Sequence, residues 1–149
     1  MKLSTGKIAF PIEFDTGDKD VIYFNPNDPN LYVRLNNLKD RVNEKLKNVK
    51  DFELNDEGKP ENPSDIEAFE IFQKVIYDEL DRAFDGNISN IIFKHCSPFA
   101  IINGEYFILQ FVNEAKKEIE KEIEKSNKDF QKKMSKYLEK YKKWFMICR

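Results

Sequence analysis

Hydrophobic positions in the first 25 residues cluster as they do in β-strands. The segment 7–14 is rich in β-branched and aromatic residues, and the apolar run 21–24 follows after a polar stretch. Two such runs around a turn-forming segment predict a β-hairpin over residues 7–25. Pro11 has no N–H to donate, so the first strand should lie at an edge or carry a bulge. Because two strands alone are marginal in water, the hairpin should rest on a helix or on a strand of another copy.

An amphipathic helix is predicted over residues 28–49. Asp28 and Pro29 have the residue types of an N-cap and a first helical position, and leucine and valine then recur at steps of three and four. Residues 50–63 are polar and contain Gly58, Pro60 and Pro63, which favour turns. That stretch therefore predicts a mobile loop.

A second helix is predicted over residues 64–85. Ser64 and Glu67 have the spacing of a capping box, in which each side chain satisfies a backbone N–H of the first turn. Gly86 follows at the position where a left-handed residue commonly ends a helix. A short helix over residues 88–94 should connect this helix to the last third of the chain.

Residues 97–145 are predicted to form one long helix or two helices. The start of this region has two interpretations, because its apolar residues fit helical spacing while Asn103-Gly104 between apolar runs also fits a two-residue hairpin. We favour a helix over 99–110. From Asn113 onward, glutamate and lysine recur three residues apart on a sequence of strong helix formers, which predicts a long charged helix.

Together these elements predict a mainly α-helical bundle with an N-terminal β-hairpin and a long charged C-terminal helix. The 149 residues are about the length of one domain, so we expect a single domain over residues 1–149.

Charge is divided unevenly along the chain. From Asn113 onward there are 12 basic and 7 acidic side chains, whereas the preceding residues carry 13 basic and 20 acidic ones. This asymmetry suits head-to-tail self-association or an acidic partner, although a solvated helical face is the commoner explanation. The net charge of −2 gives no general attraction to nucleic acid or to an anionic membrane, and we expect neither as a partner.

Two pairs of side chains have residue types that can act in catalysis. His95 and Cys96 are adjacent, and neighbouring residues point in different directions on a helix or a strand, so the imidazole cannot take the thiol proton. Asp78 and Asp81 are explained more simply as part of a charged helical face. The sequence thus predicts no catalytic residue, and we expect a protein that is not an enzyme.

Metal and disulfide chemistry is not indicated either. Asp15, Asp18 and Asp20 lie in the predicted hairpin turn, but their spacing lacks the alternating oxygen ligands of a calcium loop. Cys96 and Cys148 are far apart and belong to no cysteine or histidine cluster. We expect no metal and no cofactor.

The first ten residues lack the apolar stretch and cleavage site of a signal peptide, and no apolar run approaches the length that spans a membrane. We therefore expect a cytoplasmic protein.

The apolar stripe of the last predicted helix is narrow, as in a helix that contacts one other element or a partner helix. Packing back on the hairpin is the alternative to binding another molecule. The residues proposed to bind a partner are Phe130, Met134, Tyr137, Tyr141, Trp144 and Phe145.

Three stretches of the chain, in this order, carry a resemblance to a known family. They are the hairpin with its acidic turn (Phe10 to Phe24), the acidic helix that passes a glycine and reaches an Ile-Phe pair (Val75 to Phe93), and Phe107 to Ala115 with the Lys/Glu-rich segment after it. Together they resemble the tail assembly chaperones of long-tailed bacteriophages and prophages of Gram-positive bacteria.

The resemblance implies a non-enzymatic protein of the bacterial host cytoplasm. It would bind and solubilise the tape measure protein, recruit tail-tube subunits and form a homo-oligomer. Family members are usually made in a short form and a frameshifted longer form. A small regulatory module that binds one unidentified protein is the alternative function.

Overall fold

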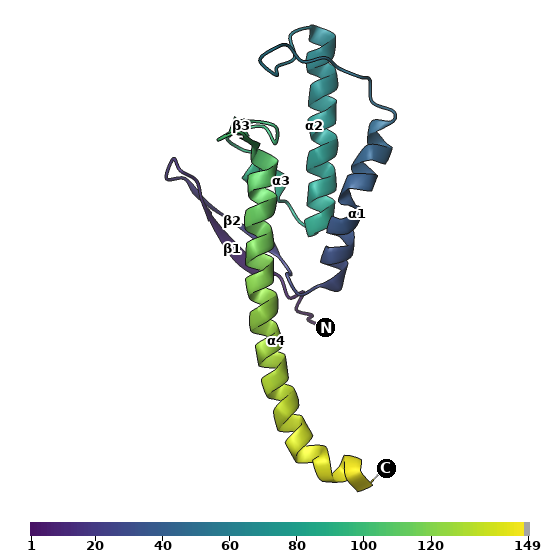
Figure 1. Cartoon of the computed structure of the whole chain (residues 1–149), viewed down its shortest axis with the longest axis vertical. Helices are drawn as coiled ribbons and strands as arrows, with labels where there is room; N and C mark the ends of the chain where they lie inside the picture. Colours follow the sequence, from purple (N-terminus) through teal and green to yellow (C-terminus); the bar gives the residue numbers. More distant parts are fainter. Residues whose placement is uncertain (148–149) are drawn as a thin grey trace.

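The computed structural model describes the backbone of residues 1–147 and the side chains of residues 1–133, 135 and 136. Within this part the chain is mainly α-helical, with a small N-terminal β-hairpin and a long C-terminal helix, as predicted. Figure 1 shows α1 and α2 side by side, with α4 running past the hairpin and far beyond it. The elements are β1 (Ile8–Glu13), β2 (Lys19–Phe24), α1 (Pro29–Leu46), α2 (Pro63–Phe84), α3 (Ser89–Ile92), β3 (Ile101–Ile102), β4 (Glu105–Tyr106) and α4 (Phe107–Ile147).

The hairpin of β1 and β2 is regular and rests on the end of α2. Its antiparallel register runs without a bulge, and Pro11 lies opposite Val21 in a sheet whose two strands are both edges. Phe10 stacks on Phe24 with ring centroids 4.1 Å apart, and Phe24 meets the edge of Phe84 at 5.1 Å. The sequence predicted support by a helix or by a strand of another copy, and the structure shows the helix.

Helix α1 begins where the sequence predicted and ends slightly earlier. The Asp28 carboxylate accepts a hydrogen bond from the backbone N–H of Asn30 at 2.9 Å and so caps the first turn. The helix stops at Leu46, and α1 packs antiparallel to α2 (Figure 1). Arg34 Nε donates to the carbonyl of Ala83 at 2.8 Å, which ties the start of α1 to the last turn of α2.

The predicted capping box at the start of α2 is wrong. The helix begins at Pro63, and the N-cap residue is Asn62, whose side chain makes no capping bond to the backbone. Proline has its φ angle already fixed near the helical value and lacks the N–H that a cap would satisfy, so it favours the first helical position. Ser64 therefore lies inside the first turn.

The left-handed residue that ends α2 is Asp85, with φ of 55°, and not Gly86 as predicted. The N–H of Gly86 donates to the carbonyl of Asp81 at 3.0 Å and closes the helix end. Gly86 instead permits a close approach, since a Cβ there would lie 3.4 Å from the carbonyl oxygen of Tyr23. Aspartate is one of the few residues besides glycine that visits the left-handed region routinely.

The predicted helix over 99–110 is wrong for its first part, where β3 and β4 form a hairpin. Asn103 and Gly104 have φ angles of 52° and 79°, and Ile101 pairs with Tyr106. Two successive positive φ angles are incompatible with a right-handed helix and match a type I′ turn. Helix α4 begins directly after this hairpin, and the N–H of Phe107 donates to the carbonyl of Ala100 at 2.9 Å.

The core lies where the hairpin, the end of α2, α3 and the first turns of α4 meet. Ile119 packs against it from α4, and further along Ser126 accepts a hydrogen bond from the Asn27 side chain at 2.9 Å. The buried core residues are Phe10, Ile22, Phe24, Leu31, Leu80, Ala83, Phe84, Ile88, Ile92, Phe93, Phe111 and Ala115.

Candidate protein-binding surfaces

Helix α4 continues past the rest of the protein as a single unpaired helix (Figure 1). We call residues 127–147 the projecting segment. At about 1.5 Å per residue this segment is about 30 Å long, roughly half of α4. All of its described side chains, at 127–133, 135 and 136, are exposed to solvent. This half of α4 is therefore available for contact with another molecule.

Apolar side chains on α4 form an exposed stripe that reaches the projecting segment. Val112, Ile123 and Phe130 are all exposed, and the Phe130 side chain is 63% exposed. They are 11 and 7 residues apart, close to three and two whole helical turns, so they share one side of the helix. With Leu109, one turn before Val112, these residues are the exposed stripe.

Of the six residues predicted to bind a partner, the structure places one. Phe130 lies on the exposed stripe, as the prediction requires. The other five predicted residues, Met134, Tyr137, Tyr141, Trp144 and Phe145, lie outside the described side chains.

A second apolar surface was missed by the sequence interpretation. Ile101, Ile102 and Tyr106 project from the β3–β4 hairpin, are exposed, and lead directly into Leu109 of the stripe. We call these three side chains the hairpin patch. Asn103-Gly104 was the sequence signal for the hairpin patch, because this dipeptide indicates the β3–β4 hairpin that carries it. The hairpin patch adjoins the start of the exposed stripe. The later part of the stripe is separate, because Ala115 and Ile119 on the same side of α4 pack on the core.

An aromatic cluster supports the hairpin patch from below. Phe99 lies edge-on to Tyr106, with centroids 5.7 Å apart, and also contacts Phe72 at 5.1 Å. Phe52, from the loop between α1 and α2, packs on Phe72 and Phe69 at 5.4 and 5.5 Å. These half-buried rings anchor the loop and give the hairpin patch a rigid base.

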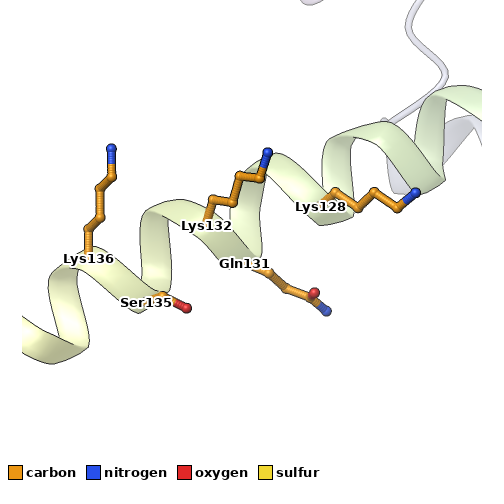
Figure 2. Close-up of a pocket in the computed structure, with 5 residues that line it drawn as sticks. All are labelled: Lys128, Gln131, Lys132, Ser135 and Lys136. Carbon is orange, nitrogen blue, oxygen red and sulfur yellow. The ribbon is translucent and has the colours of Figure 1, made fainter.

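A row of lysines runs along another side of the projecting segment. Figure 2 shows Lys128, Lys132 and Lys136 one turn apart, with Gln131 and Ser135 beside them. All five side chains come from α4 alone, so no second element encloses this surface. Lys128 lies 3.2 Å from Glu124 on the preceding turn.

Glu79 of α2 is a buried carboxylate that joins the two long helices of the body. Its side chain is 1% exposed, and it accepts a hydrogen bond from Arg41 Nε at 2.8 Å. Lys45 Nζ lies 2.5 Å from its other oxygen. Burial alone raises the pKa of a carboxyl group, but the hydrogen bonds from Arg41 and Lys45 outweigh it and hold the pKa of Glu79 below its ordinary value.

The acidic hairpin turn is bound to the loop after α3. Lys94 Nζ lies 2.6 Å from Asp18 and 3.1 Å from Asp20, and His95 Nε2 lies 2.8 Å from the same oxygen of Asp18. The His95 ring also meets the edge of Phe14 at 4.8 Å. Turn-forming aspartates thus attach the hairpin tip to the helical part, a role that the sequence interpretation did not foresee.

The pairs weighed as catalytic groups have structural roles in this arrangement. Asp81 accepts hydrogen bonds from the N–H groups of Ile88 and Ser89, at 2.9 and 2.7 Å, and from the Ser89 hydroxyl at 2.8 Å. It therefore holds the start of α3. Asp78 pairs with Lys74 on the exposed face of α2 at 2.9 Å.

The Cys96 thiol is half-buried and its imidazole neighbour is bound to Asp18. Burial raises the pKa of Cys96, which favours the neutral thiol over the nucleophilic thiolate. Among the described side chains, at 1–133, 135 and 136, no group of three or more acidic, cysteine or histidine residues is arranged to hold a metal ion. Within the same described part, no helix has the length and apolar character to cross a membrane.

Comparisons with known proteins leave the family of this chain open. No family model, curated protein or solved structure matches it. Evidence about function therefore comes from the exposed stripe, the hairpin patch and the lysine row.

Proposed function

We propose that this chain binds other proteins through the exposed stripe and the hairpin patch, and that it is a phage or prophage tail assembly chaperone. The observation that carries the proposal is the exposed Phe130 side chain on the half of α4 that has no neighbour among the described residues, together with the exposed apolar side chains from Ile101 to Val112. Exposed apolar side chains that gather on one side of a protein are typical of a binding site. The family resemblance of the sequence supplies the identity of the partners.

The shape of the surface suits a long helical partner. Apolar side chains on one side of a helix dock against the apolar face of another helix. Fully burying a Val, Leu, Ile or Phe side chain contributes about 1.5–3 kcal/mol, but the stripe and patch side chains are already partly buried in the free protein. Binding therefore recovers only part of that value, against an association cost of about 4–15 kcal/mol. One copy should therefore bind weakly, and several copies along one partner should bind well through avidity.

This behaviour is what a chaperone of the tape measure protein requires. Many copies would cover the apolar faces of the tape measure protein, keep it soluble in the bacterial host cytoplasm, and leave one by one as tail-tube subunits are recruited. We further propose that the chain self-associates into a homo-oligomer. Neither a nucleic acid nor a membrane is among the proposed partners.

Co-expression with the product of a neighbouring tape measure gene tests the proposal. The expected result is that the chain increases the soluble yield of that product. Replacing Val112 and Phe130 by aspartate removes two apolar contacts, so binding should weaken roughly 100-fold. Tyr32→Asp on α1 is the matched control, because Tyr32 is exposed and distant in sequence from the stripe.

The proposal fails if the chain leaves the tape measure product insoluble, or if the stripe variant works as well as the control. The hairpin patch supports a second candidate, a regulatory module with one compact protein partner, because Ile101 alone is 66% exposed. That function predicts loss of binding in Ile101→Asp with no loss in Phe130→Asp. The chaperone function predicts weaker binding in both variants.

A further inference from the structure

The projecting segment presents two different sides. Lys128 and Lys132 are each two positions from Phe130, which places them about 160° around the helix from it. The lysine row is therefore separate from the exposed stripe, and both sides can be occupied at once. Between residues 127 and 136 there are four lysines and one acidic residue, so this side of the helix is strongly cationic.

The opposite end of the molecule is strongly acidic. Residues 51–70, which cover the loop before α2 and its first two turns, carry eight acidic residues and one lysine. Seven of the eight carboxylates belong to exposed residues. We call residues 51–70 the acidic end. Leu54 and Ile66 are exposed among these carboxylates and add apolar contact area.

The two charged surfaces of one molecule cannot meet. Figure 1 shows the acidic end at the top of α2, while α4 runs in the other direction as one continuous helix to the bottom of the view. Contact within the chain would require α4 to break and fold back along its own length. Only a second molecule can bring the two surfaces together.

We propose that the lysine row of one copy docks on the acidic end of a second copy, head to tail. The inference takes self-association of the chain from the proposed function. It adds which two surfaces make the contact. Charge complementarity selects this arrangement, because two projecting segments side by side would place lysine rows of like charge together. Each copy keeps one lysine row and one acidic end, so the contact repeats and gives a ring or an open chain of molecules.

The expected behaviour depends on salt. Exposed charges are screened over about 10 Å at about 0.1 M ionic strength and over about 3 Å at about 1 M. Sedimentation velocity of the full chain should therefore show oligomers that grow with protein concentration at low salt. Raising the salt from about 0.02 M to about 0.5 M should weaken the association by roughly tenfold or more.

Two charge-reversal variants separate this contact from any other. The first carries Lys128→Glu, Lys132→Glu and Lys136→Glu. The second carries Lys at the five exposed glutamates of the acidic end, which changes the net charge of residues 51–70 from −7 to +3: Glu53→Lys, Glu57→Lys, Glu61→Lys, Glu67→Lys and Glu70→Lys. Each variant alone should be monomeric, because its lysine-row and acidic-end surfaces then have the same sign. An equimolar mixture should associate again, since both contacts between unlike variants are restored. The control is Lys116→Glu with Lys117→Glu and Lys121→Glu, which changes α4 by the same charge before the projecting segment.

Circular dichroism and urea unfolding establish that every variant is folded before it is compared. A wild-type chain that stays monomeric at low salt overturns the inference, and so does a mixture of the two variants that stays monomeric. Association lost equally in the control overturns it as well, because net charge alone would then be the cause. The lysine-row variant should still solubilise the tape measure product through the exposed stripe, so failure of this contact leaves the proposed function standing.

Discussion

The two halves of α4 belong to one continuous helix and have opposite surroundings. In the first half, Phe111 is 9% exposed and packs with Phe84 of α2 at 5.7 Å between ring centroids. In the second half, Phe130 on the same helix is 63% exposed and has no neighbouring element. Helix propensity therefore forms α4 throughout, while glutamate–lysine pairs up to Lys128 and tertiary packing stabilise its first half. No other element of the described structure packs against the second half.

The largest loss of stability should come from a substitution in the core beneath the first half of α4. Phe24 lies between Phe10 and Phe84 and is fully buried. Phe24→Ala should lower the free energy of unfolding by about 3–5 kcal/mol, through lost transfer energy and a residual cavity. Phe130→Ala should change it by no more than about 0.5 kcal/mol. Urea unfolding measures both, and a comparable cost at the two positions would remove the distinction between the halves of α4.

The second-largest loss of stability should come from replacing Glu79. Glu79→Gln leaves Arg41 and Lys45 without a carboxylate, but both cations are partly exposed and can be rehydrated. We expect a loss of about 2–3 kcal/mol, below the value for a fully buried pair. Glu114→Gln, which breaks an exposed pair with Lys117, is the control and should cost no more than about 0.5 kcal/mol. Equal effects in the two variants would show that burial of Glu79 is not what gives the pair its strength.

Asp81 should have a smaller effect that is confined to the α3 region. Asp81→Ala removes the acceptor of three hydrogen bonds at the start of α3, at a cost of about 1–2 kcal/mol. Hydrogen exchange should become faster at the amides of Ile88 and Ser89. Asp78→Ala on the exposed face of α2 should leave both measurements unchanged. Unaltered exchange at Ser89 in the Asp81 variant would contradict the capping role.

The smallest loss of stability should come from breaking the ion pairs that attach the hairpin tip, and this loss depends on pH. The Lys94 ammonium holds the pKa of Asp18 below its ordinary value of 3.8, and a backbone bond from Val21, with Lys94, does the same for Asp20. Because these carboxyl groups bind protons less readily when folded, their contribution is complete above pH 3.8. It is lost as the pH falls below 3.8, through the lowered pKa values.

Unfolding of Asp18→Asn with Asp20→Asn measures this contribution. The double variant should be less stable than the wild type near neutral pH, and the difference should close as the pH falls below 3.8. Asp15→Asn, at an exposed position of the same turn, is the control. A difference that stays constant down to pH 2 would show that the ion pairs with Lys94 are not its cause.

Local signals in the sequence predicted most of the fold. The residue types around Asp28 and Pro29 placed the start of α1 correctly, and alternating glutamate and lysine predicted α4. Two local signals competed at Asn103-Gly104, where apolar spacing was compatible with a helix and the dipeptide with a hairpin. The hairpin formed because that dipeptide adopts positive φ angles at little cost.

The candidate sites were less predictable, because they depend on neighbours that are distant in sequence. Nothing near Asp81 indicates that its carboxylate holds α3, and nothing near Asp18 indicates Lys94, 76 residues away. Periodicity likewise placed Phe130 on an apolar stripe, but only the arrangement of α4 past the body shows that this position has no neighbour. Exposure is a property of the whole fold, and a local pattern does not encode it.

Hydrogen–deuterium exchange along α4 tests the central claim most directly. In dilute protein, amides of residues 128–136 should exchange at least about 100-fold faster than those of residues 111–119, because only the latter are held by tertiary packing. At high protein concentration and low salt, protection of residues 128–136 should rise while that of residues 111–119 stays the same. Equal protection of the two halves in dilute protein would contradict the account, as would protection of residues 128–136 that does not respond to concentration.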